Sequence, residues 1–219
     1  MNRLVSAVIT LVCIGLLPAG CGSFSPRPDP SEFFTLSSLT QAEETACKDS
    51  SNSERISLGI GPLKFPGYLD RQEIVTRTAE NRFDVSEYDR WAEPLDENFV
   101  RVLSQNLAVL LPAGRIVQYP WPSRKKPDYR LEIEVLRFEV NGARDAQLWA
   151  RWEVIDGSSM TPVVIKESRF RRQAKDRTTD AAVAALSEAG ADLSREIADT
   201  VRSHSRKGTA MSGEVSSNK

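Results

Sequence analysis

The residues of this chain that could take part in catalysis are few and poorly placed. The single histidine, His204, adjoins a C-terminal stretch without hydrophobic periodicity, so a base there has no fixed position beside a serine nucleophile. Carboxylates that could act as an acid and base pair occur in two places, Asp70/Glu73 and Glu93/Asp96/Glu97. Acidic residues gather at helix starts and beside arginines for structural reasons. We therefore expect no enzymatic activity.

Ligands for a metal ion or a nucleotide are equally scarce. His204, Cys21 and Cys47 show no clustered spacing of the kind that zinc sites use. The glycines in Gly59-Ile60-Gly61-Pro62 are not followed by the helix and lysine of a phosphate-binding loop. We expect neither a metal nor a cofactor.

One residue, Cys21, does carry a chemical prediction. It follows a positive charge at Arg3, an apolar run from Leu4 to Leu17 and the small residues of Pro18-Ala19-Gly20, the pattern of a secretory signal peptide of about 20 residues. The apolar run, about 14 residues long, is too short for a membrane-spanning helix, which needs roughly 20. Residues 1–20 are therefore expected to be removed.

The segment Leu17-Pro18-Ala19-Gly20-Cys21 resembles a bacterial lipobox, in which the cysteine is acylated after cleavage. Pro18 departs from that pattern, and ordinary cleavage that leaves a plain thiol stays open. Two or three acyl chains, each contributing about 0.8 kcal/mol per buried methylene, would make a stable anchor. By resemblance to sorted lipoproteins, Gly22 in place of an aspartate implies the outer membrane, with the domain facing the periplasm.

Length and composition predict one domain on a short tether. Removal of residues 1–20 leaves about 199 residues, enough for one domain with a core. Residues 21–31 are rich in proline and serine and suit an extended tether, residues 32–202 form the domain, and residues 203–219 are expected to be a disordered tail. The formal net charge is -1, so we expect no nucleic-acid partner.

Hydrophobic periodicity predicts the elements of the domain. Alternating or apolar runs predict strands at residues 32–39, 56–63, 74–77, 82–85, 116–119, 129–140, 147–155 and 163–170. Three- and four-residue spacings predict a helix from Pro94 to Leu111 and a second from Asp180 to Arg202. We take the strand at 116–119 to be buried. The order predicts a single α/β domain with a mixed β-sheet and two main packing helices.

Two motifs are specific enough to suggest a family. They are Ile60–Arg77, which contains Tyr68-Leu69-Asp70-Arg71, and Arg90-Trp91-Ala92-Glu93-Pro94-Leu95. Together they resemble the ABC-type transport auxiliary lipoproteins, the paraquat-inducible and related outer-membrane lipoproteins that work beside mammalian-cell-entry (MCE) domain proteins. The resemblance spans residues 33–202 and implies an anticodon-binding-domain-like fold without catalytic residues.

The resemblance also implies a function in transport. It suggests an accessory lipoprotein that docks an MCE-type transport component to the outer membrane, in a system that moves lipids or other hydrophobic molecules across the periplasm. An alternative is a carrier that itself holds a lipid or another hydrophobic ligand in its core. The sequence also leaves a homo-oligomer open.

Six residues are candidates for binding a partner: Tyr68, Leu69, Asp70, Arg71, Trp91 and Trp121. The first four follow a Pro-Gly turn and could form an exposed edge, or Asp70 and Arg71 could form a buried pair that fixes the segment. Trp91 precedes a helix and either staples it to the sheet or contacts a lipid. Trp121, between two prolines, is either a protein contact or a lid over the core.

Overall fold

The computed structural model of the protein describes most of the chain after the tether. The described residues are 28–39, 56–111, 114–121 and 126–216, with side chains described as far as residue 205. Contacts divide the chain into two units, Met1–Pro30 and Ser31–Lys219, and the described secondary structure lies in the second unit. The predicted signal peptide and Cys21 lie outside the described residues.

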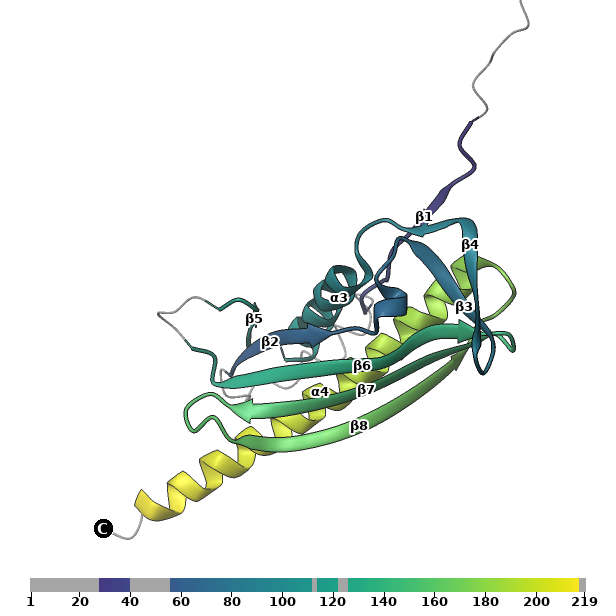
Figure 1. The fold of residues 1–219 in the computed structure, drawn as a ribbon. Helices are drawn as coiled ribbons and strands as arrows, with labels where there is room; N and C mark the ends of the chain where they lie inside the picture. The colour runs from purple at the N-terminus through teal and green to yellow at the C-terminus, as the bar shows by residue number, and fades with distance from the viewer. Residues whose placement is uncertain (1–27, 40–55, 112–113, 122–125, 217–219) are drawn as a thin grey trace, which may run out of the picture. The chain divides into compact units, whose positions relative to one another are not determined.

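The second unit consists of strands and two long helices, drawn in Figure 1. In chain order the elements are β1 (Glu32–Phe34), β2 (Ser57–Lys64), the 3₁₀ turn η1 (Gly67–Leu69), β3 (Glu73–Ala79), β4 (Arg82–Trp91), α3 (Leu95–Leu110), β5 (Arg115–Gln118), β6 (Tyr129–Asn141), β7 (Asp145–Asp156), β8 (Pro162–Gln173) and α4 (Thr179–Ser216).

The long strand β6 organises an eight-stranded mixed sheet. Along one side it pairs antiparallel with β7, which pairs antiparallel with β8. Along the other side, its first half pairs parallel with β2, which is followed by parallel β5. Its last residues pair parallel with β3, which leads to antiparallel β4 and parallel β1. The predicted single mixed α/β domain with two packing helices is confirmed.

The helices lie on one face of this sheet, behind the strands in Figure 1. Alternation in β6 turns Leu131, Ile133 and Val135 toward them, and a bulge after Val135 lets Phe138 and Val140 resume the same side. The most buried core residues include Leu58, Ile60, Leu107, Trp152, Leu193 and Ile197. The apolar stripe of α3 therefore packs on the sheet as its sequence spacing predicts.

The opposite face of β6, β7 and β8, which we call the open face, carries charged side chains in cross-strand rows. Trp149 on β7 lies between Arg137 on β6 and Arg169 on β8, whose guanidinium carbons are 4.0 and 4.5 Å from its ring centroid. A neighbouring row joins Arg151 to Glu134 at 3.1 Å and to Glu167 at 3.6 Å. Opposite charges side by side let this face meet water without a covering helix.

Three local predictions differ from the structure. Strand β1 ends at Phe34, and residues 35–39 leave the sheet. Strand β5 is a half-exposed edge strand, not the buried strand expected at 116–119. The expected disordered tail is helical as far as Ser216. No proline follows Pro162 in the chain, and extending an existing helix costs far less than starting one, so α4 continues past Arg202.

Two glycines give opposite predictions for substitution by alanine. A Cβ at Gly157 would overlap the backbone carbonyl oxygen of Pro127 and lie 3.0 Å from that of Asp128. We expect Gly157→Ala to lower the free energy of unfolding by about 1–3 kcal/mol, because backbone has to move. At Gly190, inside α4, a Cβ meets no atom within 4 Å, so Gly190→Ala should raise that free energy by about 0.5–1 kcal/mol.

Urea unfolding of both variants and of the parent protein measures these two changes in unfolding free energy. The comparison requires that the free energy falls with urea concentration at the same slope in all three proteins. A stabilising Gly157→Ala would contradict the close approach of the turn after β7 to the chain before β6.

Candidate docking surface

Two buried amides of α3 hold the chain segment that follows β1. Asn98 Oδ1 accepts a hydrogen bond from the backbone N–H of Leu36 at 2.9 Å, and Asn106 Oδ1 accepts one from Leu39 at 2.8 Å. Both asparagines are at most 1% exposed. Leu36 and Leu39 thus have acceptors for their backbone N–H groups although residues 35–39 leave the sheet. We call Asn98, Asn106 and residues 35–39 the clamp.

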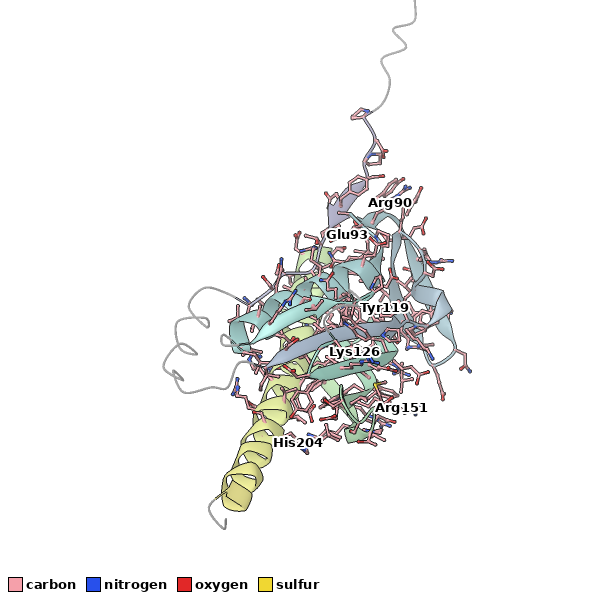
Figure 2. The ribbon with its side chains drawn as sticks, turned by 90° about the vertical axis from the view of Figure 1, so that its left-hand side faces the viewer. Arg90, Glu93, Tyr119, Lys126, Arg151 and His204 are labelled. Atoms are coloured by element: carbon pink, nitrogen blue, oxygen red, sulfur yellow. The ribbon has the colours of Figure 1, made fainter. Side chains whose placement is uncertain are left out.

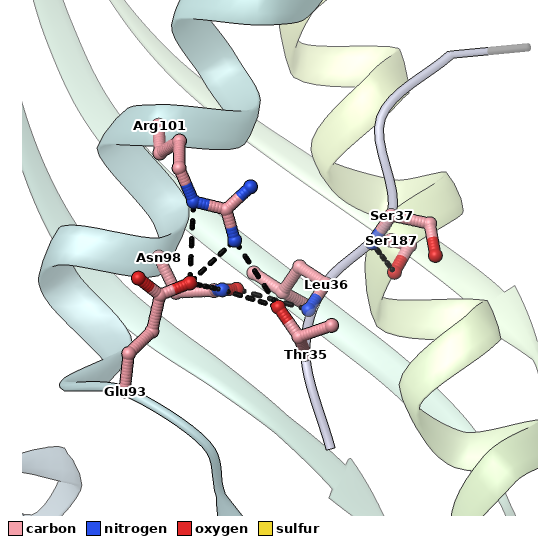
Figure 3. Close-up of polar contacts among 7 residues, drawn as sticks. All are labelled: Thr35, Leu36, Ser37, Glu93, Asn98, Arg101 and Ser187. Carbon is pink, nitrogen blue, oxygen red and sulfur yellow. Dashed lines mark hydrogen bonds and ion pairs between the residues drawn. The ribbon is translucent and has the colours of Figure 1, made fainter.

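The second helix completes the clamp from the other side. The backbone N–H of Ser37 donates to Ser187 Oγ on α4 at 3.0 Å, as Figure 3 shows. Asn106 Nδ2 donates to Ser194 Oγ, also on α4, at 3.1 Å. The segment is therefore fixed to both helices by side-chain groups.

The motif at residues 90–95 builds this clamp. Glu93 Oε1 accepts hydrogen bonds from Asn98 Nδ2 and from Arg101, whose Nε lies 3.2 Å away (Figure 3). Hydrogen bonds from Arg101 and then Asn98 hold the pKa of Glu93 below its usual range. Trp91 and Leu95 are 5% and 3% exposed and join the core. The structural interpretation of Trp91 therefore fits the geometry, and Glu93 orients the amide of Asn98.

The motif around Tyr68 fixes η1 to the middle of the sheet. The Tyr68 hydroxyl donates to Glu139 Oε2 on β6, and its ring stacks on Phe83 at 4.6 Å. Arg77 Nε donates to the other oxygen of Glu139 at 2.6 Å, and Arg137 lies 3.4 Å from it. Burial, and then the bond to Glu139, raise the pKa of the Tyr68 phenol. The phenol therefore stays protonated and donating well above neutral pH.

The side chain of Glu139 is 1% exposed, so Tyr68, Arg77 and Arg137 take the place of water around its carboxyl group. A buried carboxylate without a cation or donor costs several kcal/mol, on the order seen when one member of a buried pair is removed. This cluster, made of Tyr68, Arg77, Arg137 and Glu139, thus has a structural role: it joins η1, β3 and β6. We call it the Glu139 cluster.

Of the six predicted partner residues, two are buried, two are exposed, and Tyr68 and Trp121 are half-buried. Leu69 and Trp91 are each 5% exposed, so neither offers a surface to a partner. Asp70 and Arg71 are both exposed, and the interpretation of these two as a buried pair is wrong. Because η1 brings Leu69 inward, the two residues after it point outward at the turn into β3.

Trp121 covers β2 on the side away from the helices. Leu58 and Ile60 face the core, so Gly59 between them faces outward, and a Cβ there would overlap the Trp121 indole. The indole Nε1 donates to the Val117 carbonyl at 3.3 Å, and Arg130 lies 5.0 Å above the ring. Trp121 remains half-exposed. It is therefore a lid over the outer side of the sheet, not over the helix-packed core.

The groups that could have supported catalysis are dispersed. His204 lies on α4 and Glu93 at the other end of the domain, as Figure 2 shows. Among the described residues, no three or more His, Cys, Asp and Glu side chains are arranged to hold a metal ion. In the same part of the chain, no helix has the length and apolar character to cross a bilayer.

Two cavities inside the described part of the domain are very small. One, lined by residues that include Trp91 and Phe138, lies between the sheet and the helices, and the other lies between α3, α4 and Leu36; each has about 10 Å³. A single water needs roughly 10–15 Å³. The larger hollows open outward. One of about 230 Å³ lies on the open face beside Lys64, Arg151 and Ile165, and one of about 440 Å³ lies along α4.

Comparison with known proteins assigns this domain to a family. The family model described as the ABC-type transport auxiliary lipoprotein component matches residues 34–198. The chain belongs to this family. The match begins at the end of β1 and ends within α4, so it contains the clamp and the Glu139 cluster. No curated protein sequence matches the chain.

Two solved structures share the fold. Protein XCC0632 from Xanthomonas campestris superposes with a TM-score of 0.65 at 14% identity, covering 82% of this chain and 99% of that one. A second, uncharacterised protein gives a TM-score of 0.64 at 18% identity and covers 78% of this chain and 98% of that one. At such identities the likeness establishes the fold alone.

The clamp predicts a large effect for one amide. Asn98→Ala should lower the free energy of unfolding by about 3 kcal/mol, because it leaves the buried Leu36 N–H without an acceptor and leaves Glu93 with Arg101 as its remaining donor. Gln118→Ala is the matched control, since its amide makes an exposed bond to Ser104, and it should change stability by less than about 0.5 kcal/mol. If urea unfolding gave the same loss of unfolding free energy for Asn98→Ala and Gln118→Ala, the role of Asn98 in the clamp would be contradicted.

The Glu139 cluster predicts the effect of removing one hydroxyl. Tyr68→Phe keeps the stacking on Phe83 but takes a donor from a buried carboxylate, so we expect a loss of about 1.5–3 kcal/mol in unfolding free energy. Tyr119→Phe removes a hydroxyl from a side chain that is 58% exposed, and its melting temperature should match the parent's. Thermal unfolding gives the melting temperatures of both variants. A Tyr68→Phe protein with the melting temperature of the parent would rule out a stabilising role for the Tyr68 hydroxyl.

Proposed function

We propose that this protein is a lipid-anchored periplasmic accessory component of an ABC-type transport system, and that it docks an MCE-domain component to the outer membrane. Membership of the auxiliary lipoprotein family supports the transport role. The signal-peptide pattern that ends at Cys21, with Gly22 after it, supports the anchor and the membrane. The protein acts by binding, without catalysis.

The observation that carries docking rather than carriage is the size of the interior cavities. Pockets that bury a small-molecule ligand have roughly 300–1,000 Å³, whereas the two interior cavities lined by described residues have about 10 Å³ each. An acyl chain could enter either cavity only if the elements that line it moved apart. The surface of the domain is therefore what it offers to other components.

Of the predicted partner residues, Asp70, Arg71 and Trp121 remain available on that surface. Asp70 and Arg71 are charged and exposed at the turn after η1, and half-exposed Trp121 lies 5.2 Å from the ring of Tyr119, which is 58% exposed. Exposed aromatic and arginine side chains are favoured contacts in protein interfaces. The same surface would serve a second copy of the chain in a homo-oligomer.

The anchor is tested by removing the thiol. We expect Cys21→Ala to move the protein from the outer-membrane fraction to the soluble periplasmic fraction and to abolish complementation of a deletion strain, because the acyl chains supply the membrane affinity. Cys47→Ala removes the other thiol of the mature chain and should keep both properties. Continued outer-membrane fractionation of Cys21→Ala with full complementation would refute the proposal.

The carrier alternative has its own readout. Native mass spectrometry of the purified protein should give the mass of the polypeptide and its own acyl groups alone, since the two interior cavities lined by described residues are too small for a further lipid. Phospholipid that copurifies in a fixed ratio with Cys21→Ala protein would favour carriage.

A further inference from the structure

Two aromatic side chains are exposed where the domain begins. Phe33 on β1 is 64% exposed, and Tyr88 on the neighbouring strand β4 is 45% exposed. We call these two residues the aromatic edge. Phe33 pairs with Arg90, and Arg90 lies at the end of the domain where the chain enters from the tether, as Figure 2 shows.

Alternation explains why these rings do not join the core. Asp89 accepts a hydrogen bond from Thr179 at the start of α4, and Trp91 is buried, so both turn toward the helices. Tyr88 and Arg90 alternate with them and turn the other way, and Phe33 follows Arg90, its partner in the parallel register. Exposure of the aromatic edge is thus built into the strand pairing and is not a matter of rotamer.

The chain outside the domain fixes how far this edge can lie from the anchor. Residues 22–31 separate Cys21 from β1, and at no more than about 3.6 Å per residue they span roughly 36 Å when fully extended. Hydrogen bonds to Asn98 on α3 and Ser187 on α4 hold the segment 35–39 between the helices. The domain therefore cannot lengthen the tether by releasing this segment. Along the chain, the aromatic edge is the first part of the domain that the anchor reaches.

The chemistry of the edge suits the boundary between lipid headgroups and acyl chains. Phe33 offers an apolar ring, while Tyr88 combines a ring with a hydroxyl that is bonded to Glu87 at 2.8 Å. Amphipathic aromatic residues concentrate at membrane interfaces, where the ring lies among acyl carbons and the polar group among headgroups. Once one part of a molecule is anchored, a second weak contact benefits from a high local concentration.

We propose that Phe33 and Tyr88 insert into the interface of the bilayer that holds the acyl chains of Cys21. The contact gives the domain a fixed orientation, with β1 and β4 toward the membrane. The turn between β7 and β8 points away from it, because that turn lies at the Tyr129 end of β6 while β3, β4 and β1 lie beyond the Val140 end. This inference rests on the proposed anchor at Cys21.

Spin labels on the acylated, full-length mature protein test it. In a Cys47→Ser background, single labels are placed through Phe33→Cys, Tyr88→Cys or Met160→Cys, and each protein is reconstituted into vesicles of phosphatidylethanolamine and phosphatidylglycerol. Met160, 50% exposed in the turn between β7 and β8, is the control for a site away from the membrane. Collision with oxygen and with a water-soluble nickel complex is measured in solution and on vesicles.

We expect labels at positions 33 and 88 to gain access to oxygen and lose access to the nickel complex on vesicles, while the label at 160 keeps its solution values. Adding Phe33→Ser to the Tyr88→Cys protein should reverse part of the shift at 88.

Three outcomes overturn the inference and are distinguishable. If the protein floats with the vesicles but reagent access at positions 33 and 88 equals that in solution, the aromatic contact is overturned and the anchor stays intact. Loss of access to both reagents at position 33 assigns the edge to contact with a second copy of the chain. Protein that does not float with vesicles at all overturns the anchor and, with it, the proposed function.

Discussion

Satisfaction of buried backbone donors after β1 is the constraint on which this domain depends. Residues 35–39 pass between α3 and α4 without strand partners, and Asn98 and Asn106 supply the missing acceptors. An unsatisfied buried N–H costs roughly 1–3 kcal/mol, a large fraction of the 5–15 kcal/mol that stabilises most domains. The two amides therefore decide whether the first segment of the domain can join the two helices, and the helices in turn cover the sheet.

The two motifs that mark the family serve this architecture. Tyr68 donates to the buried carboxylate of Glu139, and Glu93 binds the side chain of Asn98, while Leu69 and Trp91 fill the core. These residues therefore belong to the structure of the domain. Exposed positions, by contrast, can vary without cost to packing.

Local patterns in the sequence predicted most of the strands and both helices. The features that they did not predict, the clamp and the burial of Glu139, depend on contacts between residues far apart in the chain. The strands near 56–63 and 129–140 and the helix from Pro94 are clear because their periodicity depends on neighbours a few residues apart. The clamp joins residues 62 to 150 positions apart in the chain. Asn106 within the apolar stripe of its helix hinted at a buried amide, whereas nothing around Glu139 in an alternating strand distinguished it from its solvated neighbours. The shorter β1 follows from the same limit, whereas the longer α4 reflects propagation of a helix along the chain.

The parallel pairing of β1 with β4 determines how the domain resists tension. A pull directed along the axis of β1 would load its backbone hydrogen bonds with β4 together in shear, among them Ala92 N–H to the Phe34 carbonyl at 2.9 Å. Strands pulled in shear share the load among all their bonds, whereas strands peeled from one end break them in turn. Residues 35–39 behind β1 are gripped by both helices, so a strained anchor would have to part the α3 and α4 layer before it could extract the chain.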